Sequence, residues 1–180
     1  MFCKVPYIPF LLICILGCQH SPQDRKAADQ AAVVVVIPGT WLWDADANAF
    51  PTTPSDNKAD FHWGHQDEKE RYLQPRNGAM AAIIASRPFE RIDLAFAKAA
   101  DLSGDRITDS DRNNTLGPGT VVVLKTSDGR FGVLQVIRYR PLHDLSFPAA
   151  SILDEETREF IMDQPNLKHY HLEFRWRSLG

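Results

Sequence analysis

The sequence predicts a β-rich α+β domain built on an antiparallel sheet, and three observations lead to that class. Two β-branched runs at about 120–139 are joined by the turn sequence "SDGR". The closing segment at about 169–177 alternates polar and apolar side chains, as a strand with one buried face does. Helical periodicity is limited to one or two short segments, at about 93–101 and 152–163. Residues 31–180 suit a single domain of this kind.

The domain is expected to begin with strands. "AVVVVIP", residues 32–38, is a continuous β-branched run that suits a buried strand. "GTWLWD" and "DFHWGH" are aromatic segments that also suit strands, and "AMAAIIA", after the Asn77-Gly78 turn, suits another. "DLAFAKAADL", which starts at Asp93, is the shorter of the two helix candidates.

The hairpin predicted for the second half of the chain pairs residues 120–126 with residues 131–139. Between them, Asp128-Gly129 provides the positive φ that a tight turn needs. The closing strand is predicted to be antiparallel and half-buried, because its large apolar residues fall on one face. These residues are Tyr170, Leu172, Phe174 and Trp176.

The longer helix candidate, "SILDEETREFIMDQP", has both end signals. Ser151 can cap its N-terminus, Asp154 completes the capping pattern, and Pro165 ends it. Its expected apolar stripe consists of Ile152, Phe160 and Ile161.

The N-terminus contains the apolar run "FLLICILGCQH". From Tyr7 to Gly17 the run is too short to span a bilayer, which takes roughly 20 apolar residues. One positive charge at Lys4, an apolar stretch and a small residue at the end are typical of an export signal, here residues 1–17.

"ILGC", Ile15 to Cys18, resembles the lipobox of bacterial lipoproteins. That resemblance implies cleavage before Cys18, lipidation of its thiol and acylation of the new amine. Ile15 and the bulky Leu16 depart slightly from the family pattern; an ordinary signal peptide and a cytosolic chain are the alternatives. Gln19 follows where Asp usually marks inner-membrane retention, so the resemblance implies a bacterial cell-envelope protein on the outer membrane, facing the periplasm.

Cleavage would leave Cys18 as the only cysteine, because Cys3 and Cys14 lie in the signal. The mature domain would therefore have no disulfide and no cysteine-based metal site or nucleophile. Residues 18–30 are polar and are interpreted as a lipidated tether that would reach about 20 Å as a coil and roughly 40 Å when extended.

The charge balance argues against a nucleic-acid partner. Without the signal, which contains only Lys4, 19 basic residues face 23 acidic ones, a net charge of −4. Nucleic-acid binding requires a clustered basic face.

Several groups of residues are candidates for chemistry. In a strand, His169, His171 and Glu173 share a face and could bind zinc or another divalent ion, although Arg175 and Arg177 continue that face like an ordinary solvated surface. His62 and His65 would point to opposite faces of a strand.

Trp41 and Trp43, two residues apart, could form a stacking platform for a glycan or another flat ligand, or could be core residues. Arg71 and Arg76 are interpreted as surface charges, with anion contacts as the alternative. The acidic segments "DADAN" and "DRITDSDRNN" lack the glycine and glutamate of a calcium loop and are interpreted as solvated turns.

The strand–"TSDGR"–strand unit, with Leu172, Phe174 and Trp176 after it, resembles the closing module of small secreted β-rich bacterial domains of unknown function. The "KTSDG" turn is also similar to turns in β-rich haem-binding lipoproteins, in which paired histidines bind the haem iron. This second resemblance assigns no ligand residue here.

These observations predict a lipid-anchored cell-envelope protein that acts as a non-enzymatic binding or interaction module. Its partners would be the membrane, through the lipid, and an envelope protein or a glycan, with no cofactor. The alternatives are a lipoprotein that binds a divalent metal, haem or another small ligand, and a metal-assisted hydrolase.

Overall fold

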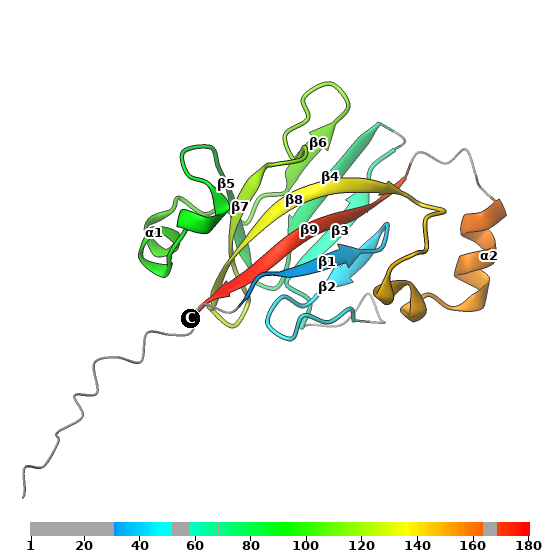
Figure 1. The fold of residues 1–180 in the computed structure, drawn as a ribbon, viewed down its shortest axis with the longest axis horizontal. Coiled ribbons are helices and arrows are strands. Elements are labelled where there is room, and N and C mark those ends of the chain that lie inside the picture. The colour runs from blue at the N-terminus through cyan, green and yellow to red at the C-terminus, as the bar shows by residue number, and fades with distance from the viewer. Residues whose placement is uncertain (1–30, 52–57, 68, 164–168) are drawn as a thin grey trace, which may run out of the picture.

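The computed structural model describes residues 31–51, 58–67, 69–163 and 169–180, which form two antiparallel sheets (Figure 1). The five-stranded sheet contains, in spatial order, β1 (Val33–Ile37), β9 (Tyr170–Leu179), β8 (Phe131–Pro141), β7 (Val121–Lys125) and β5 (Met80–Ile84). The four-stranded sheet contains β2 (Trp41–Trp43), β3 (Phe61–His65), β4 (Glu70–Pro75) and β6 (Ile107–Ser110). The β-rich antiparallel fold predicted from the sequence is confirmed, and the second sheet is new.

The core lies between the two sheets. Alternate residues of each strand point into it, so that Trp43 of the four-stranded sheet meets Phe174 and Trp176 of the five-stranded one. The ring centroids of Trp43 are 5.0 Å from Phe174 and 5.1 Å from Trp176, both edge-on. This aromatic layer joins the two sheets.

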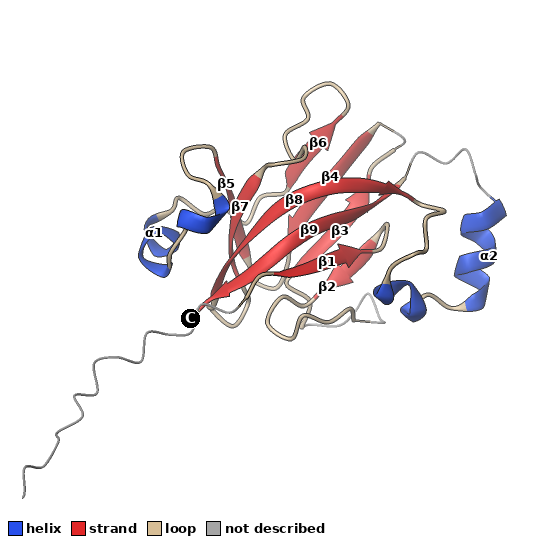
Figure 2. Ribbon diagram, viewed as in Figure 1, coloured by secondary structure: helices blue, strands red, loops and turns tan. Residues whose placement is uncertain are grey.

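Short helical segments cover the outer face of the five-stranded sheet near its two ends (Figure 2). At one end, η2 (Phe89–Arg91) and α1 (Leu94–Ala99) pack on Val121, Val123 and Val133. At the other end, Ala150 of η3 (Pro148–Ile152) and Phe147, which precedes η3, pack on Val36. Asp93 caps α1 by accepting the backbone N–H of Phe96, which confirms the shorter helix candidate.

The longer helix candidate is divided in two. The 3₁₀ turn η3 comes first, and α2 (Glu155–Asp163) follows. The residue that caps α2 is Asp154, which accepts the N–H of Thr157, whereas the Ser151 hydroxyl donates to the carbonyl of Pro148 inside η3. Ile161 is buried as expected but Phe160 is exposed, and Pro165 lies outside the described residues.

The predicted hairpin is confirmed as β7 and β8, with a detail of the turn changed. Gly129 has φ +81°, while Asp128 does not have a positive φ. The backbone N–H of Thr126 donates to the carbonyl of Arg130, and the N–H of Gly129 to the carbonyl of Thr126. A single left-handed residue after a type I turn is the usual arrangement of a hairpin loop longer than two residues.

The closing strand β9 is confirmed, but the prediction that it is half-buried is wrong. Most of its polar face is also covered: His171 is 0% exposed, Glu173 7% and Arg177 9%, whereas Arg175 is 32% exposed. The reason is topological, because β9 lies between β1 and β8 inside the sheet and the helical segments cover its outer face. The Arg177 guanidinium donates to the carbonyl oxygens of Phe89 and Ile92.

The valine run forms β1 at the border of the five-stranded sheet. Val35 and Ile37 point into the core, but Val33 and Val34 are 43% and 63% exposed, so the run is not buried throughout as predicted. The signal segment 1–17, Cys18 and the tether 18–30 lie outside the described residues. Within the described part of the chain, no helix has the length and apolar character needed to cross a bilayer.

Candidate functional site

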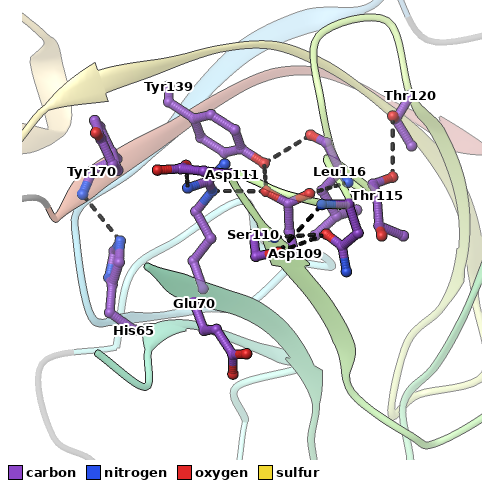
Figure 3. Close-up of polar contacts among 12 residues, drawn as sticks. His65, Glu70, Asp109, Ser110, Asp111, Thr115, Leu116, Thr120, Tyr139 and Tyr170 are labelled. Carbon is purple, nitrogen blue, oxygen red and sulfur yellow. Dashed lines mark hydrogen bonds and ion pairs between the residues drawn. The ribbon is translucent and has the colours of Figure 1, made fainter. Parts of the chain in front are cut away.

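A buried polar cluster lies on the inner face of the four-stranded sheet (Figure 3). Its centre is an ion pair between Arg71 of β4 and Asp109 of β6, which face each other in the strand register. Arg71 Nε lies 2.7 Å from Asp109 Oδ2, and the two side chains are only 5% and 0% exposed. Arg71 Nη1 also donates to Asp111 at 2.8 Å.

Tyr139 of β8 joins this pair to the loop that follows β6. Its hydroxyl is 2.9 Å from Asp109 Oδ2 and 2.8 Å from the Leu116 carbonyl oxygen, two acceptors that share one proton (Figure 3). Asp109 Oδ1 accepts the N–H of Leu116 at 2.8 Å. Both backbone groups of Leu116 are therefore fixed by the cluster, and the loop between β6 and β7 is anchored to the core.

The guanidinium of Arg71 also stacks on aromatic rings. Its carbon lies 4.3 Å from the centroid of Tyr139 and 5.6 Å from that of Tyr170. The buried cation is thus surrounded by two carboxylates and two tyrosine rings, which compensates for its removal from water.

At the rim of the cluster, two side chains of β3 hold the start of β9. His65 Nε2 accepts the backbone N–H of Tyr170 at 3.0 Å, and Trp63 Nε1 donates to the Tyr170 carbonyl oxygen at 2.8 Å. The ring of His65 stacks on His169, with centroids 4.4 Å apart and planes 11° apart. His65 Nδ1 is buried without a hydrogen-bond partner among the described residues.

The protonation states in the cluster are fixed around neutral pH. Burial, then the charges of His169 and Arg71, lower the pKa of His65 to about 3. Burial raises the pKa of the Tyr139 phenol above its ordinary value. Burial alone would lower the pKa of Arg71, but the hydrogen bonds to Asp111 and Tyr139 outweigh it and raise that pKa.

Neutral His65, neutral Tyr139 and charged Arg71 are poorly suited to exchange protons with a substrate near pH 7. Arg71 and Asp109 are, in addition, buried and paired with each other, so neither charge is open to a substrate. The cluster therefore has a structural role, because it links the two sheets.

The predicted metal ligands do not come together around one point. His171 Nδ1 accepts the N–H of Gly39 at 2.9 Å, and its Nε2 lies 2.7 Å from the Leu142 carbonyl oxygen. Glu173 pairs with Arg138 and Arg140. His169 stacks on His65. A metal ion lies in the plane of each imidazole ring that binds it, so these two stacked rings cannot share one ion. Among the described residues, no group of three or more histidine, cysteine, aspartate or glutamate side chains is placed to hold a metal.

The two tryptophans proposed as a stacking platform differ in burial. Trp43 is 0% exposed in the aromatic core and offers no free ring face. Trp41 is partly buried against Leu142, Leu153 and Ile161 beside α2, and its Nε1 lacks a hydrogen-bond partner in the described structure.

The described surface has several hollows, and two of them bear on the choice of a partner. One, of about 550 Å³, lies at the β7–β8 turn and is lined by charged residues that include Asp46, whose pKa is raised chiefly by burial. The other, of about 540 Å³, follows β1 and is lined mostly by apolar side chains. We call the second hollow the β1 groove: it lies along residues 34–36, between Asn48 and Phe50 on one side and residues 147–149 on the other.

Comparison with protein-family models, with curated proteins and with solved structures finds no match for this chain. The candidate site therefore rests on geometry alone.

Sequence reasoning missed the cluster because it treated its members as surface charges or solvated turns. Asp109 lies in the strand β6, where a loop was expected, and Arg71 is buried where a surface charge was expected; Arg76 is exposed as expected. A signal was present in "ERYLQP", where Arg71 alternates with Leu73 and so belongs to the same face of a strand.

Proposed function

We propose that this chain is a lipid-anchored protein of the bacterial cell envelope, and that its β-rich α+β domain acts as a non-enzymatic binding module. Cys18, in its lipobox-like setting, is the proposed lipidation site. The outer membrane, with the domain facing the periplasm, is the proposed location.

The observation that carries the binding role is the apolar surface along β1. Val34 is 63% exposed at a sheet border and lines the β1 groove together with Phe50, Phe147 and Pro148. Contiguous apolar surface on a soluble domain is a mark of an interaction site. The ionisable groups of the buried cluster, in contrast, are occupied by one another.

Fractionation of cells tests the anchor. The full chain is expected in the membrane fraction, and Cys18→Ser is expected to move the protein to the soluble envelope fraction, because two or three acyl chains supply most of the membrane affinity. Cys3→Ser is the matched control, since that residue lies in the segment proposed to be cleaved. Membrane retention of Cys18→Ser would refute the anchor.

The same cells test the binding role. Amine-reactive crosslinking in intact envelopes is expected to convert the anchored protein into discrete larger species. A protein that stays at its monomer mass under conditions that crosslink known envelope complexes would contradict the binding role.

A further inference from the structure

We propose that the free edge of β1 binds an extended, uncharged segment of a partner polypeptide as an additional antiparallel or parallel strand. This inference rests on the proposed binding function and names its surface and its class of ligand.

The first argument is the contrast between β1 and the other sheet borders. An unpaired strand edge presents free N–H and C=O groups, which proteins normally protect with charges, bulges, short strands or covering segments. β2 has only three residues. β5 is bridged on its free side by Ser103, which exchanges two backbone hydrogen bonds with Ala81.

The border strand β6 is protected in its own way. Asn113 accepts the backbone N–H of Ser110 at 2.8 Å, and the chain turns back on itself at that point. β1 has no such protection: it consists of five residues, "VVVVI", without a charge, a proline or a bridge on its free side among the described residues.

The second argument is the shape of the β1 groove. The free edge is set between Asn48 and Phe50 on one side and Phe147 and Pro148 on the other, around a space of about 540 Å³. Val35 packs into the core between the sheets and Val36 packs against Phe147 and Ala150, so both faces of the strand are covered beside this edge. A recessed edge admits one strand but obstructs the edge of a whole second sheet, because a second copy brings the same walls with it. This favours a peptide segment over a second copy of the chain.

The lining of the groove defines the chemistry of the segment. Arg140 is its charged lining residue, and this side chain already pairs with Glu173 and Asp144. A charged ligand residue would therefore gain no unpaired partner there. The five residues of β1 correspond to about 17 Å of extended chain, enough for a segment of about five residues with small apolar side chains toward the groove.

Hydrogen–deuterium exchange of the full, lipidated chain in detergent tests the proposal. The probe is the acetylated peptide Thr-Val-Thr-Val-Thr, which is uncharged when its C-terminus is amidated. At saturating peptide, amide exchange in residues 33–37 is expected to slow at least tenfold, while exchange in the other border strand, β5, stays unchanged. The same peptide with all of its internal amides N-methylated is the control, because neither of its edges can donate to the ladder, and it is expected to give no protection.

Matched variants separate the surface from the fold. Val34→Lys is expected to weaken peptide protection at least tenfold, because it places a charge on the open edge, whereas Ile83→Lys on β5 is expected to have no effect; both side chains are exposed. Lack of protection at millimolar peptide, equal protection by the N-methylated peptide, or an unchanged Val34→Lys variant overturns the proposal.

Protection of residues 33–37 that depends on protein concentration without peptide would assign the edge to a second copy and also overturn it. Different results would refute the proposed function, namely wild-type protein in the soluble fraction or a lack of crosslinked species. Crosslinked species that persist in Val34→Lys would leave the binding module standing and refute only the edge.

Discussion

At the scale of single residues, His65 shows how a buried polar side chain closes the sandwich. Tyr170 is paired with Pro141 of β8 on one side, and β3 belongs to the other sheet. His65 and Trp63 nevertheless engage the N–H and the carbonyl of Tyr170 as a neighbouring strand would. This works only while His65 Nε2 is unprotonated and can accept a hydrogen bond.

The closure by His65 predicts a loss of stability in acid. Its folded-state pKa of about 3 is below the unfolded value of about 6.5, so the unfolded chain takes up the proton first. Stability is therefore full above pH 6.5 and falls as the pH drops toward 3. Relative to His65→Gln, which does not titrate, the wild-type free energy of unfolding should fall by about 1.4 kcal/mol per pH unit between pH 5.5 and 4.

Urea unfolding of both proteins at each pH measures this difference. Around pH 8 the difference in the free energy of unfolding between the two proteins should not change with pH, because His65 is neutral in both the folded and the unfolded chain. A wild-type curve that stays parallel to that of His65→Gln down to pH 4 would show that His65 is protonated equally in the folded and unfolded chains.

At the scale of secondary-structure elements, the β7–β8 hairpin depends on one backbone conformation. Gly129 has φ +81°, and no heavy atom would come within 4 Å of an added Cβ. A substitution there consequently tests backbone strain with little effect on packing. The chain uses asparagine at three other positive φ values, in Asn48, Asn77 and Asn114.

Gly129→Val is expected to destabilise the domain by about 1–2 kcal/mol, because a β-branched residue resists positive φ. For a domain of this size the melting temperature should fall by about 2–8 °C. Asparagine tolerates that conformation, so the melting temperature of Gly129→Asn should fall distinctly less. Equal melting temperatures for the valine and asparagine variants would mean that φ at this position does not limit stability.

The sequence predicted those elements whose signals are local. The hairpin is marked by Asp128-Gly129 between two β-branched runs, and β9 by strict alternation. The covered outer face of β9 could not be predicted, because Arg177 donates to the carbonyl oxygens of Phe89 and Ile92, far away along the chain.

The candidate site was less predictable for the same reason. Arg71, Asp109 and Tyr139 come from three strands in two sheets, and only the packing of those sheets shows that they meet. An isolated arginine or aspartate in a sequence is most often solvated. The β1 groove likewise depends on which strand lies at the border, and local sequence does not determine strand order.

At the scale of the whole molecule, the two ends of the sandwich differ in their relation to the proposed anchor. β1 starts beside the final residues of β9, since Val33 is the register partner of Trp176, and Phe131 after the β7–β8 turn is the partner of Leu179. α2 lies beyond the opposite end of β9 (Figure 1). A lipid on Cys18, followed by a short tether, would hold the β7–β8 turn near the bilayer and α2 away from it.

This orientation predicts unequal distances from the membrane. The ten residues of β9 separate the two ends by about 33 Å, more than the roughly 20 Å average reach of the proposed tether. A fluorophore on Asp128→Cys should be quenched more by nitroxide headgroup lipids than the same fluorophore on Glu156→Cys in α2. Cys18 does not compete for the label when its thiol carries the proposed lipid. Equal quenching at the two sites would show that the anchored domain tumbles freely, and stronger quenching at residue 156 would reverse the orientation.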